Sequence, residues 1–299
     1  MTDATILLTD LVVGESPRWH DDRLWFCHWG ADELVTVDMH GHRETVPLDL
    51  SAKPQSIDWL PDGRLLVITG TREGAGRLLR QEPDGTLLQH ADLTGFGLSK
   101  WNEIVVDGRG NIYVNNLCFD FMAFLERVRD ADDQQRAWQE RKGYEPGIIA
   151  LITPDGSVRQ VADGIEFPNG MVVTPDNRTL IVSESFAGRL TAFDIAADGG
   201  LSRRRVWADD IGPDGICLDT EGAIWTTPGT NACVRVREGG EILERIELDR
   251  APFACMLGGP DGRTLFVMAA EWHPENPFGG PRTGRVLTAP APAPHAGRP

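Results

Sequence analysis

The sequence contains no run of about twenty consecutive apolar residues, which is the length that a membrane-spanning helix requires. Residues 1–4 include an acidic residue and no basic one, and the apolar run at residues 6–8 is too short for the core of a secretory signal. These absences lead us to expect a soluble, cytoplasmic protein that has no membrane partner.

Cysteine is scarce, and its few copies form no recognisable pattern. The chain has five cysteines, which are Cys27, Cys118, Cys217, Cys233 and Cys255. They are odd in number and scattered through apolar segments, so they indicate neither a disulfide framework nor a Cys-x-x-Cys metal site. We expect reduced thiols in or near the core, as is usual in the cytosol.

Positive charge is also in short supply. The chain has 29 lysines and arginines against 45 aspartates and glutamates, which gives a formal net charge of −16. The negative electrostatic field of such a protein repels phosphate backbones, so we expect no nucleic-acid partner. The acidic balance suits either a soluble enzyme or a cation-binding protein.

Several familiar motifs are missing. No serine lies in a Gly-x-Ser-x-Gly elbow, which argues against a Ser–His–Asp hydrolase. No glycine-rich phosphate loop or dinucleotide fingerprint opens a helix. WD and kelch signatures are absent as well, which argues against a propeller that serves as a protein-interaction platform.

What the sequence does contain is an internal repeat. Residues 167–173 (Phe-Pro-Asn-Gly-Met-Val-Val) resemble residues 212–218 (Gly-Pro-Asp-Gly-Ile-Cys-Leu), and four further segments align with them. Each copy is followed by a turn rich in Asp, Gly, Pro or Asn and then by a β-rich run. Six copies with four short strands each predict an all-β fold, a six-bladed β-propeller of four-stranded antiparallel blades, in preference to a β-sandwich.

The two ends of the repeat array predict how the ring closes. The sixth copy has its third strand at residues 285–288 and lacks a fourth. Residues 5–8 precede the first copy, so we expect this N-terminal strand to complete blade six and seal its edge. Residues 1–289 would then form one domain, and the Ala-Pro repeats of the tail, residues 290–299, are expected to be disordered.

One interval between copies is longer than the others. Within the third repeat, residues 118–147 carry apolar side chains at helical spacing, which predicts an inserted helical lid or loop. In a propeller this insertion would lie on the same face as the beginnings of the inner strands. Either a pocket wall or a surface decoration fits the pattern.

One aligned position, just before each inner strand, carries mostly oxygen-bearing side chains. Its six occupants are Glu15, Gln55, Asn102, Asn169, Asp214 and Phe253. Turn chemistry alone can explain a single Asn-Gly or Asp-Gly pair. The aligned set, which contains no His or Cys, instead predicts a site for one divalent cation, with Ca²⁺ first and Mg²⁺, Mn²⁺ or Zn²⁺ behind it.

Several motifs, spread from about residue 12 to about residue 270, carry a resemblance to a known family. The segments concerned are Gly14-Glu15-Ser16-Pro17, Asn102 with Val105-Val106-Asp107-Gly108, Phe167-Pro168-Asn169-Gly170 and Pro213-Asp214-Gly215. Together they resemble the regucalcin/senescence marker protein, gluconolactonase and luciferin-regenerating-enzyme family. The resemblance implies that Glu15, Asn169 and Asp214 hold one divalent metal and that Asn102 contacts the substrate.

The chain departs from this family at two positions beside Asn102. Lys100 stands where animal members have an arginine, so a point charge replaces a bidentate fork. Glu103 stands where the family usually has an aspartate. We expect Lys100, Asn102 and Glu103 to form the substrate-binding side of the site, with a substrate that differs from those of the best-known members.

The resemblance implies a metal-dependent lactonase that hydrolyses a sugar (aldono) lactone or a related small lactone. Asp214 would act as general base or proton shuttle, and Asn102 with Lys100 would orient the substrate. Two alternatives stay open, which are a metal-dependent phosphotriesterase or aryl esterase and a non-catalytic calcium-binding or ligand-sensing propeller. The sequence leaves the oligomeric state open.

Overall fold

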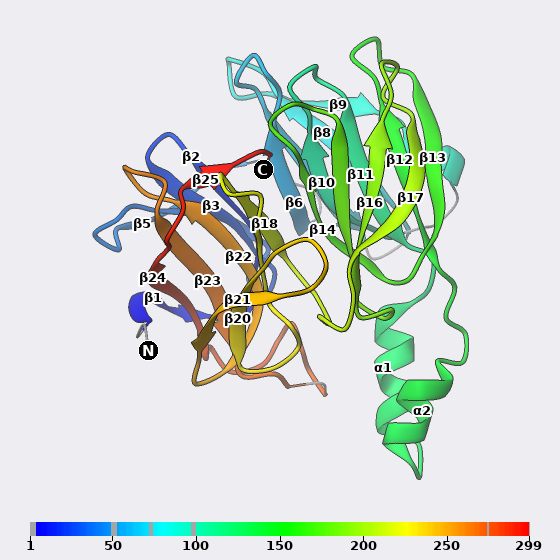
Figure 1. Cartoon of the computed structure of the whole chain (residues 1–299), viewed down its shortest axis with the longest axis vertical. Helices are drawn as coiled ribbons and strands as arrows, with labels where there is room; N and C mark the ends of the chain where they lie inside the picture. Colours follow the sequence, from blue (N-terminus) through cyan, green and yellow to red (C-terminus); the bar gives the residue numbers. More distant parts are fainter. Residues whose placement is uncertain (1–3, 49–52, 72–73, 97–99, 274, 299) are drawn as a thin grey trace.

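The computed structural model describes residues 4–48, 53–71, 74–96, 100–273 and 275–298. Within these residues the strands form six antiparallel sheets, five of four strands and one of five. The first strands of consecutive sheets contact one another, β2 with β6, β6 with β10 and so on around to β22 with β2. The sheets are therefore the blades of a closed propeller, and the predicted six-bladed fold is confirmed (Figure 1).

Each blade runs from an inner strand at the axis to an outer strand at the rim. The strands of the first three blades are β2 (Gly14–His20), β3 (Arg23–His28), β4 (Glu33–Val37) and β5 (Arg43–Thr45); β6 (Lys53–Trp59), β7 (Leu65–Thr71), β8 (Gly74–Gln81) and β9 (Leu87–Ala91); and β10 (Lys100–Val106), β11 (Ile112–Leu117), β12 (Gly147–Ile152) and β13 (Val158–Ile165).

The last three blades repeat this order. Their strands are β14 (Pro168–Val173), β15 (Thr179–Glu184), β16 (Arg189–Ile195) and β17 (Leu201–Ala208); β18 (Ile216–Asp219), β19 (Ile224–Thr226), β20 (Ala232–Val236) and β21 (Ile242–Glu247); and β22 (Ala251–Gly258), β23 (Thr264–Ala270) and β24 (Gly284–Pro290), completed by β1 (Thr5–Leu11). A 3₁₀ turn, Thr94–Phe96, precedes β10.

The Asp-Gly segments form the tight turns that the sequence indicates. Between β10 and β11, Asp107 Oδ1 accepts hydrogen bonds from the N–H groups of Arg109 and Asn111, at 2.8 and 2.9 Å. Gly110 adopts a left-handed φ of +83°, which a residue with a side chain rarely adopts. Such turns keep successive strands adjacent, so each blade assembles from local contacts.

The hydrophobic core lies between neighbouring blades. The cluster between blades two and three, for example, contains Leu66, Ile68, Trp101, Ile104 and Val114, all almost fully buried. Blades pack on both faces, so their central strands read as nearly continuous apolar runs.

The ring is closed by strands from opposite ends of the chain. β1 pairs with β24 in antiparallel register, with Thr5 opposite Thr288 and Leu11 opposite Gly284. The two strands lie side by side in Figure 1. This confirms the prediction that the N-terminal strand supplies the missing outer strand of blade six.

The prediction of a disordered tail is wrong for residues 290–298, while Pro299 lies outside the described residues. β25 (His295–Ala296) pairs with the inner strand β18, and Arg298 forms a bridge with Val173 of β14. Proline lacks an N–H group, but the carbonyl oxygen of Pro294 accepts a hydrogen bond from Thr220 N at 2.9 Å. The intervening residues supply donors, so the tail pairs with backbone groups in the turns and inner strands of blades four, five and six.

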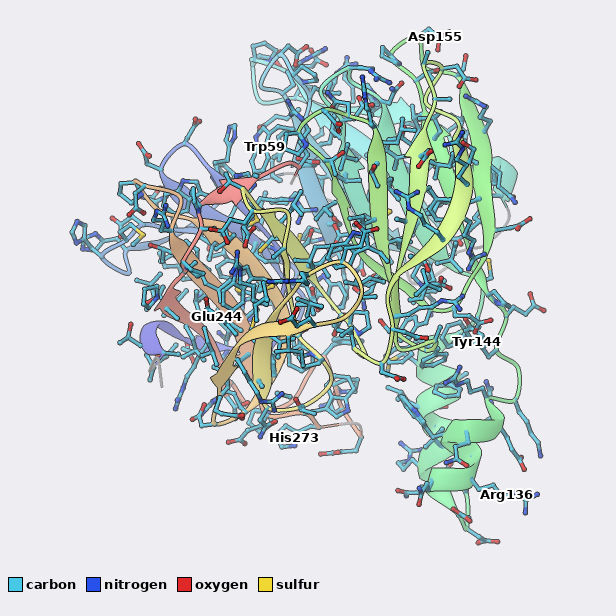
Figure 2. All side chains as sticks on the ribbon, viewed as in Figure 1. Trp59, Arg136, Tyr144, Asp155, Glu244 and His273 are labelled. Atoms are coloured by element: carbon cyan, nitrogen blue, oxygen red, sulfur yellow. The ribbon has the colours of Figure 1, made fainter. Side chains whose placement is uncertain are left out.

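Two helices occupy the long interval between β11 and β12. They are α1 (Phe121–Arg129), capped by Asp120, and α2 (Gln134–Glu140), capped by Asp133, and they project from one end of the propeller (Figure 1). Tyr144 and His273 lie toward that end, and Asp155 lies at the other (Figure 2). No helix in the described part of the chain is long and apolar enough to cross a membrane.

Candidate metal and substrate site

The aligned polar position coincides with a β-bulge in most inner strands. The pairing register shifts between Glu15 and Arg18 in β2, between Trp101 and Ile104 in β10, and between Pro168 and Met171 in β14, with similar shifts in β6 and β22. A bulge takes a residue out of the ladder and redirects its side chain. This local geometry explains why the repeat presents polar side chains at the mouth of the channel.

Glycines next to the predicted ligands allow the inner strands to approach one another closely. A Cβ on Gly170 would lie 2.6 Å from Ile216 N, and a Cβ on Gly215 would lie 2.7 Å from Ala254 Cα. Gly170 N instead donates a hydrogen bond to the carbonyl oxygen of Asp214, at 3.3 Å. The Asn-Gly and Asp-Gly pairs therefore bring blades four, five and six together at a narrow neck.

Four of the predicted site residues meet in one cavity at this neck. Glu15, Asn102, Asn169 and Asp214 all line a cavity of about 400 Å³, on the end of the propeller from which the helices project. They come from blades one, three, four and five, respectively, so only the closed ring assembles them. Gln55, from the same aligned position, is not among the lining residues.

The two carboxylates of this cavity lack compensating partners. Asp214 Oδ1 is buried and accepts no hydrogen bond in the described part of the chain. Glu15 Oε2 accepts one, from Ser16 N at 3.1 Å. Burial and the facing Asp214 raise the pKa of Glu15 well above its usual range, and burial with the nearby Glu103 raises the pKa of Asp214 to about 8.

These observations fit a divalent cation. A buried carboxylate oxygen without a partner is costly, and a cation placed between two carboxylates removes that cost. Among the residues that the structure describes, no three His, Cys, Asp or Glu side chains gather as a metal-binding group. The donor set would be two carboxylates plus the amide oxygen of Asn169, all of them hard oxygen ligands.

Asn102 occupies the position expected for a substrate contact. Its Nδ2 donates a hydrogen bond to the carbonyl oxygen of Pro168, at 3.1 Å, which fixes the amide in the cavity wall. The amide oxygen accepts no hydrogen bond from the described residues and so can contact a ligand.

Lys100 and Glu103, which were predicted as substrate contacts, are not among the described residues that line the cavity. Lys100 is exposed, and its Nζ lies 3.2 Å from Asp120 Oδ1, where it pairs with the helix cap of the insertion. Glu103 is buried beneath the cavity, in the channel. The bulge in β10 separates Asn102 and Glu103, placing one at the mouth and the other below it.

Glu103 is the centre of a buried network that fills the channel below the cavity. Its Oε1 accepts hydrogen bonds from Arg18 Nη2 at 2.7 Å, from Ser16 Oγ at 3.1 Å and from Ser56 Oγ. Arg18 Nη2 also donates to the carbonyl oxygen of Ile104, at 2.8 Å. This pairing makes Glu103 a structural residue beneath the site.

Aromatic side chains form most of the cavity wall. On one side lie Phe121 and Trp138 of the helical insertion with Phe167 and Phe186 of blade four, which we call the insertion-side wall. Phe186 is central to it, with ring centroids 4.6 Å from Phe167 and 5.7 Å from Trp138.

The opposite side, which we call the blade-six wall, is equally aromatic. It is formed by Trp29, Phe253, Trp272 and Phe278. Trp29 meets Phe278 edge to face at 5.5 Å, and Phe253 lies 5.6 Å from Trp272. These residues come from distant segments, so no local pattern in the sequence marks them as a group.

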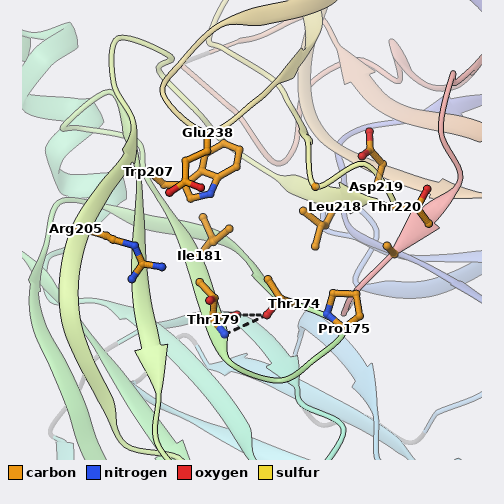
Figure 3. A pocket seen from close by; sticks show the side chains of 12 residues that line it. Thr174, Pro175, Thr179, Ile181, Arg205, Trp207, Leu218, Asp219, Thr220 and Glu238 are labelled. Carbon is orange, nitrogen blue, oxygen red and sulfur yellow. Dashed lines mark hydrogen bonds between the residues drawn. The ribbon is translucent and has the colours of Figure 1, made fainter.

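A second hollow, of about 350 Å³, lies between blades four and five near the tail (Figure 3). Its floor includes Ile181, Trp207 and Leu218. Two of its charged groups are paired outside it, since Arg205 Nη1 lies 2.7 Å from Asp194 Oδ1 and Asp219 Oδ2 lies 2.7 Å from Arg235 Nε, and Glu238 also lines it.

The fold and the site together define a class of protein, the six-bladed propellers that carry an oxygen-lined cavity at the mouth of the channel. A family model described as the SMP-30/Gluconolactonase/LRE-like region matches residues 13–271. The chain belongs to this family.

Individual relatives cover nearly the whole chain. Regucalcin from Danio rerio is 32% identical over 285 residues, which cover 86% of this chain and 83% of the relative. Pentonolactonase XacC from Haloferax volcanii is 24% identical over 281 residues, which cover 90% and 86%. The solved structure of a luciferin-regenerating enzyme is similar to this chain with a TM-score of 0.77 at 15% identity, and the match covers 99% of this chain and 98% of that one. This is a similarity of fold.

Proposed function

We propose that this protein is a divalent-metal-dependent hydrolase that opens the ring of a sugar lactone or a related small lactone. Membership of a family that includes gluconolactonases supports the reaction type, and a pentonolactonase is among the relatives. The observation that carries the proposal is the pair of carboxylates, Glu15 and Asp214, at the bottom of a cavity, with Asp214 Oδ1 buried and unpartnered.

Glu15, Asn169 and Asp214 would hold the cation. Ca²⁺ is the first candidate because every donor is an oxygen, and Mg²⁺, Mn²⁺ and Zn²⁺ follow. When bound, the cation would polarise the lactone carbonyl and lower the pKa of a nearby water. Three protein ligands leave room for both water and substrate.

The residues of the chain would then handle the proton and the orientation of the substrate. Asp214 would take a proton from the attacking water as the new C–O bond forms, and would return it to the ring oxygen as the ester C–O bond breaks. One water is consumed, and a hydroxy acid is the product. Asn102, fixed by Pro168, would hold the lactone next to these groups.

We also place the protein in the cytoplasm, where its small-molecule substrate would be found. Cys27, Cys217, Cys233 and Cys255 are buried free thiols. Free thiols are usual in that compartment.

The test measures metal content and turnover together. Purified protein would be analysed for bound metal and then assayed with glucono-δ-lactone and other lactones, with and without a chelator. We expect turnover that is lost on chelation, restored by Ca²⁺, and absent in Asp214→Ala. Asp209→Ala, at an exposed carboxylate five residues earlier, is the matched control and should behave as the wild type.

Three outcomes would overturn the proposal. An active, metal-replete Asp214→Ala protein would remove Asp214 from the site. Metal-dependent hydrolysis of a phosphotriester or aryl ester with no lactone turnover would favour the esterase alternative. Tight calcium binding without hydrolysis of any of these substrates would favour a sensor.

A further inference from the structure

We infer that the substrate of this site carries an apolar, aromatic-sized substituent, so that the enzyme prefers an aryl or alkyl lactone over a polyhydroxylated aldonolactone. This inference rests on the proposed lactone hydrolysis and names its substrate class. It is argued from the chemistry of the cavity walls, above the oxygen ligands.

Aromatic rings face the cavity from both sides. The insertion-side wall and the blade-six wall each contribute four aromatic side chains. Their rings contact one another at edge-to-face or tilted angles, so each wall is a packed surface. A flat apolar group of a ligand would gain burial between two such surfaces.

Polar groups for substrate hydroxyls are few among the described residues of the cavity. Apart from the three proposed metal ligands and the indole N–H groups of its tryptophans, the polar side chains that line it are Asn102 and Ser185. Ser185 Oγ already donates its hydrogen to the carbonyl oxygen of Pro213, at 2.8 Å. An aldonolactone would bury several hydroxyls here without partners, and each would weaken binding by on the order of tenfold.

The insertion supplies the part of the wall that can vary without disturbing the propeller. Trp138 belongs to α2, is 41% exposed, and packs on Phe124 of α1 at 5.3 Å between ring centroids. It therefore meets the cavity from outside the blades. We assign Trp138 as a specificity residue that covers the apolar part of the substrate.

The first measurement compares three lactones with the calcium-loaded protein. Dihydrocoumarin carries an aromatic ring, δ-valerolactone is unsubstituted, and glucono-δ-lactone is polyhydroxylated. We expect kcat/KM for dihydrocoumarin to exceed that for glucono-δ-lactone by at least about a hundredfold, since two or more hydroxyls stay unpaired. In Trp138→Ala the ratio of dihydrocoumarin to δ-valerolactone should fall about tenfold. Ile242→Ala, which truncates a 51%-exposed side chain away from the cavity, should leave that ratio unchanged.

The second measurement removes differences in intrinsic lactone reactivity. Calorimetric titration of the calcium-loaded protein with the ring-opened acids should give at least tenfold tighter binding for 3-(2-hydroxyphenyl)propanoate than for gluconate. Equal or tighter binding of gluconate would overturn the inference, as would a preference for glucono-δ-lactone in turnover. If no lactone is opened, the proposed function fails, and the titration still decides the chemistry of the cavity.

Discussion

The buried pair between Arg18 and Glu103 offers a quantitative test of how the site is supported from below. The Arg18 Nη2 to Glu103 Oε1 distance is 2.7 Å, and the two side chains are only 6% and 10% exposed. Arg18 belongs to blade one and Glu103 to blade three, so the pair connects inner strands across the channel. Arg18→Met keeps much of the side-chain volume and removes the charge.

The expected effect follows from the burial of the partner. Removing one member of a buried pair leaves an uncompensated charge and typically costs about 3–5 kcal/mol of unfolding free energy. For a chain somewhat longer than 250 residues this corresponds to a fall in Tm of roughly 6–15 °C. The loss should be largest in the presence of a chelator, where no bound cation offsets the nearby carboxylates.

Calorimetry of the wild type, Arg18→Met and the double variant Arg18→Met/Glu103→Met would measure this. The double variant removes both charges and should recover most of the loss. Arg136→Met is the matched control, because the Arg136–Glu140 pair is 2.6 Å long but 73% and 35% exposed, and it should change stability by less than about 0.5 kcal/mol. An Arg18→Met protein within 2 °C of the wild-type Tm, by the same scale, would refute the structural role of the pair.

Four further predictions address the metal site and the tail. Asp214→Asn should weaken Ca²⁺ binding by at least about a hundredfold. In the presence of a chelator at pH 8 the same change should raise Tm, because it removes a buried, unpartnered charge. A lower Tm in calorimetry would contradict this. The pKa of Asp214 is raised to about 8 in the folded protein without metal. Between about pH 4 and pH 8 the folded protein therefore holds a proton on Asp214 that the unfolded protein has released. The free energy of unfolding without metal should fall as the pH rises through this range. For the same reason Ca²⁺ affinity, measured by titration at pH 6, 7 and 8, should weaken about tenfold per unit below 8, and a flat profile would exclude the proton competition. Removal of residues 291–299 deletes five backbone hydrogen bonds with Arg263, Gly262, Thr220 and Val173, and should cost about 3 kcal/mol in urea unfolding; an unchanged midpoint would make the tail dispensable.

The repeat made the propeller predictable because each blade is built from neighbouring segments of the chain. Turns such as Asp107–Asn111 recur before every second strand, so the alignment of one repeat with the next also aligned Glu15, Asn102, Asn169 and Asp214. Their convergence then follows from ring closure alone. A periodic sequence specifies a radial fold, and the fold specifies which side chains meet.

The features that could not be predicted from the sequence arise from β-bulges and from pairing between distant segments. The bulge between Trp101 and Ile104 sends Asn102 and Glu103 to different levels of the channel, and adjacent residues in a sequence do not reveal such a shift. The prolines of the tail cannot form a ladder and so predicted disorder, yet its carbonyl groups and intervening N–H groups pair with blades four, five and six.

The aromatic walls of the cavity and the two carboxylates at its bottom, Glu15 and Asp214, affect the same metal site. Burial is the largest cause of the raised pKa values of Glu15 and Asp214, and aromatic rings form most of the walls of the cavity in which these carboxylates lie. In such a low-dielectric setting a divalent cation interacts more strongly with the two carboxylates than it would in open water. Because these ligands come from different blades, a bound cation would also stabilise the closed ring, by binding to the folded state alone. The walls that select an apolar substrate would therefore also strengthen the binding of the metal that acts on it.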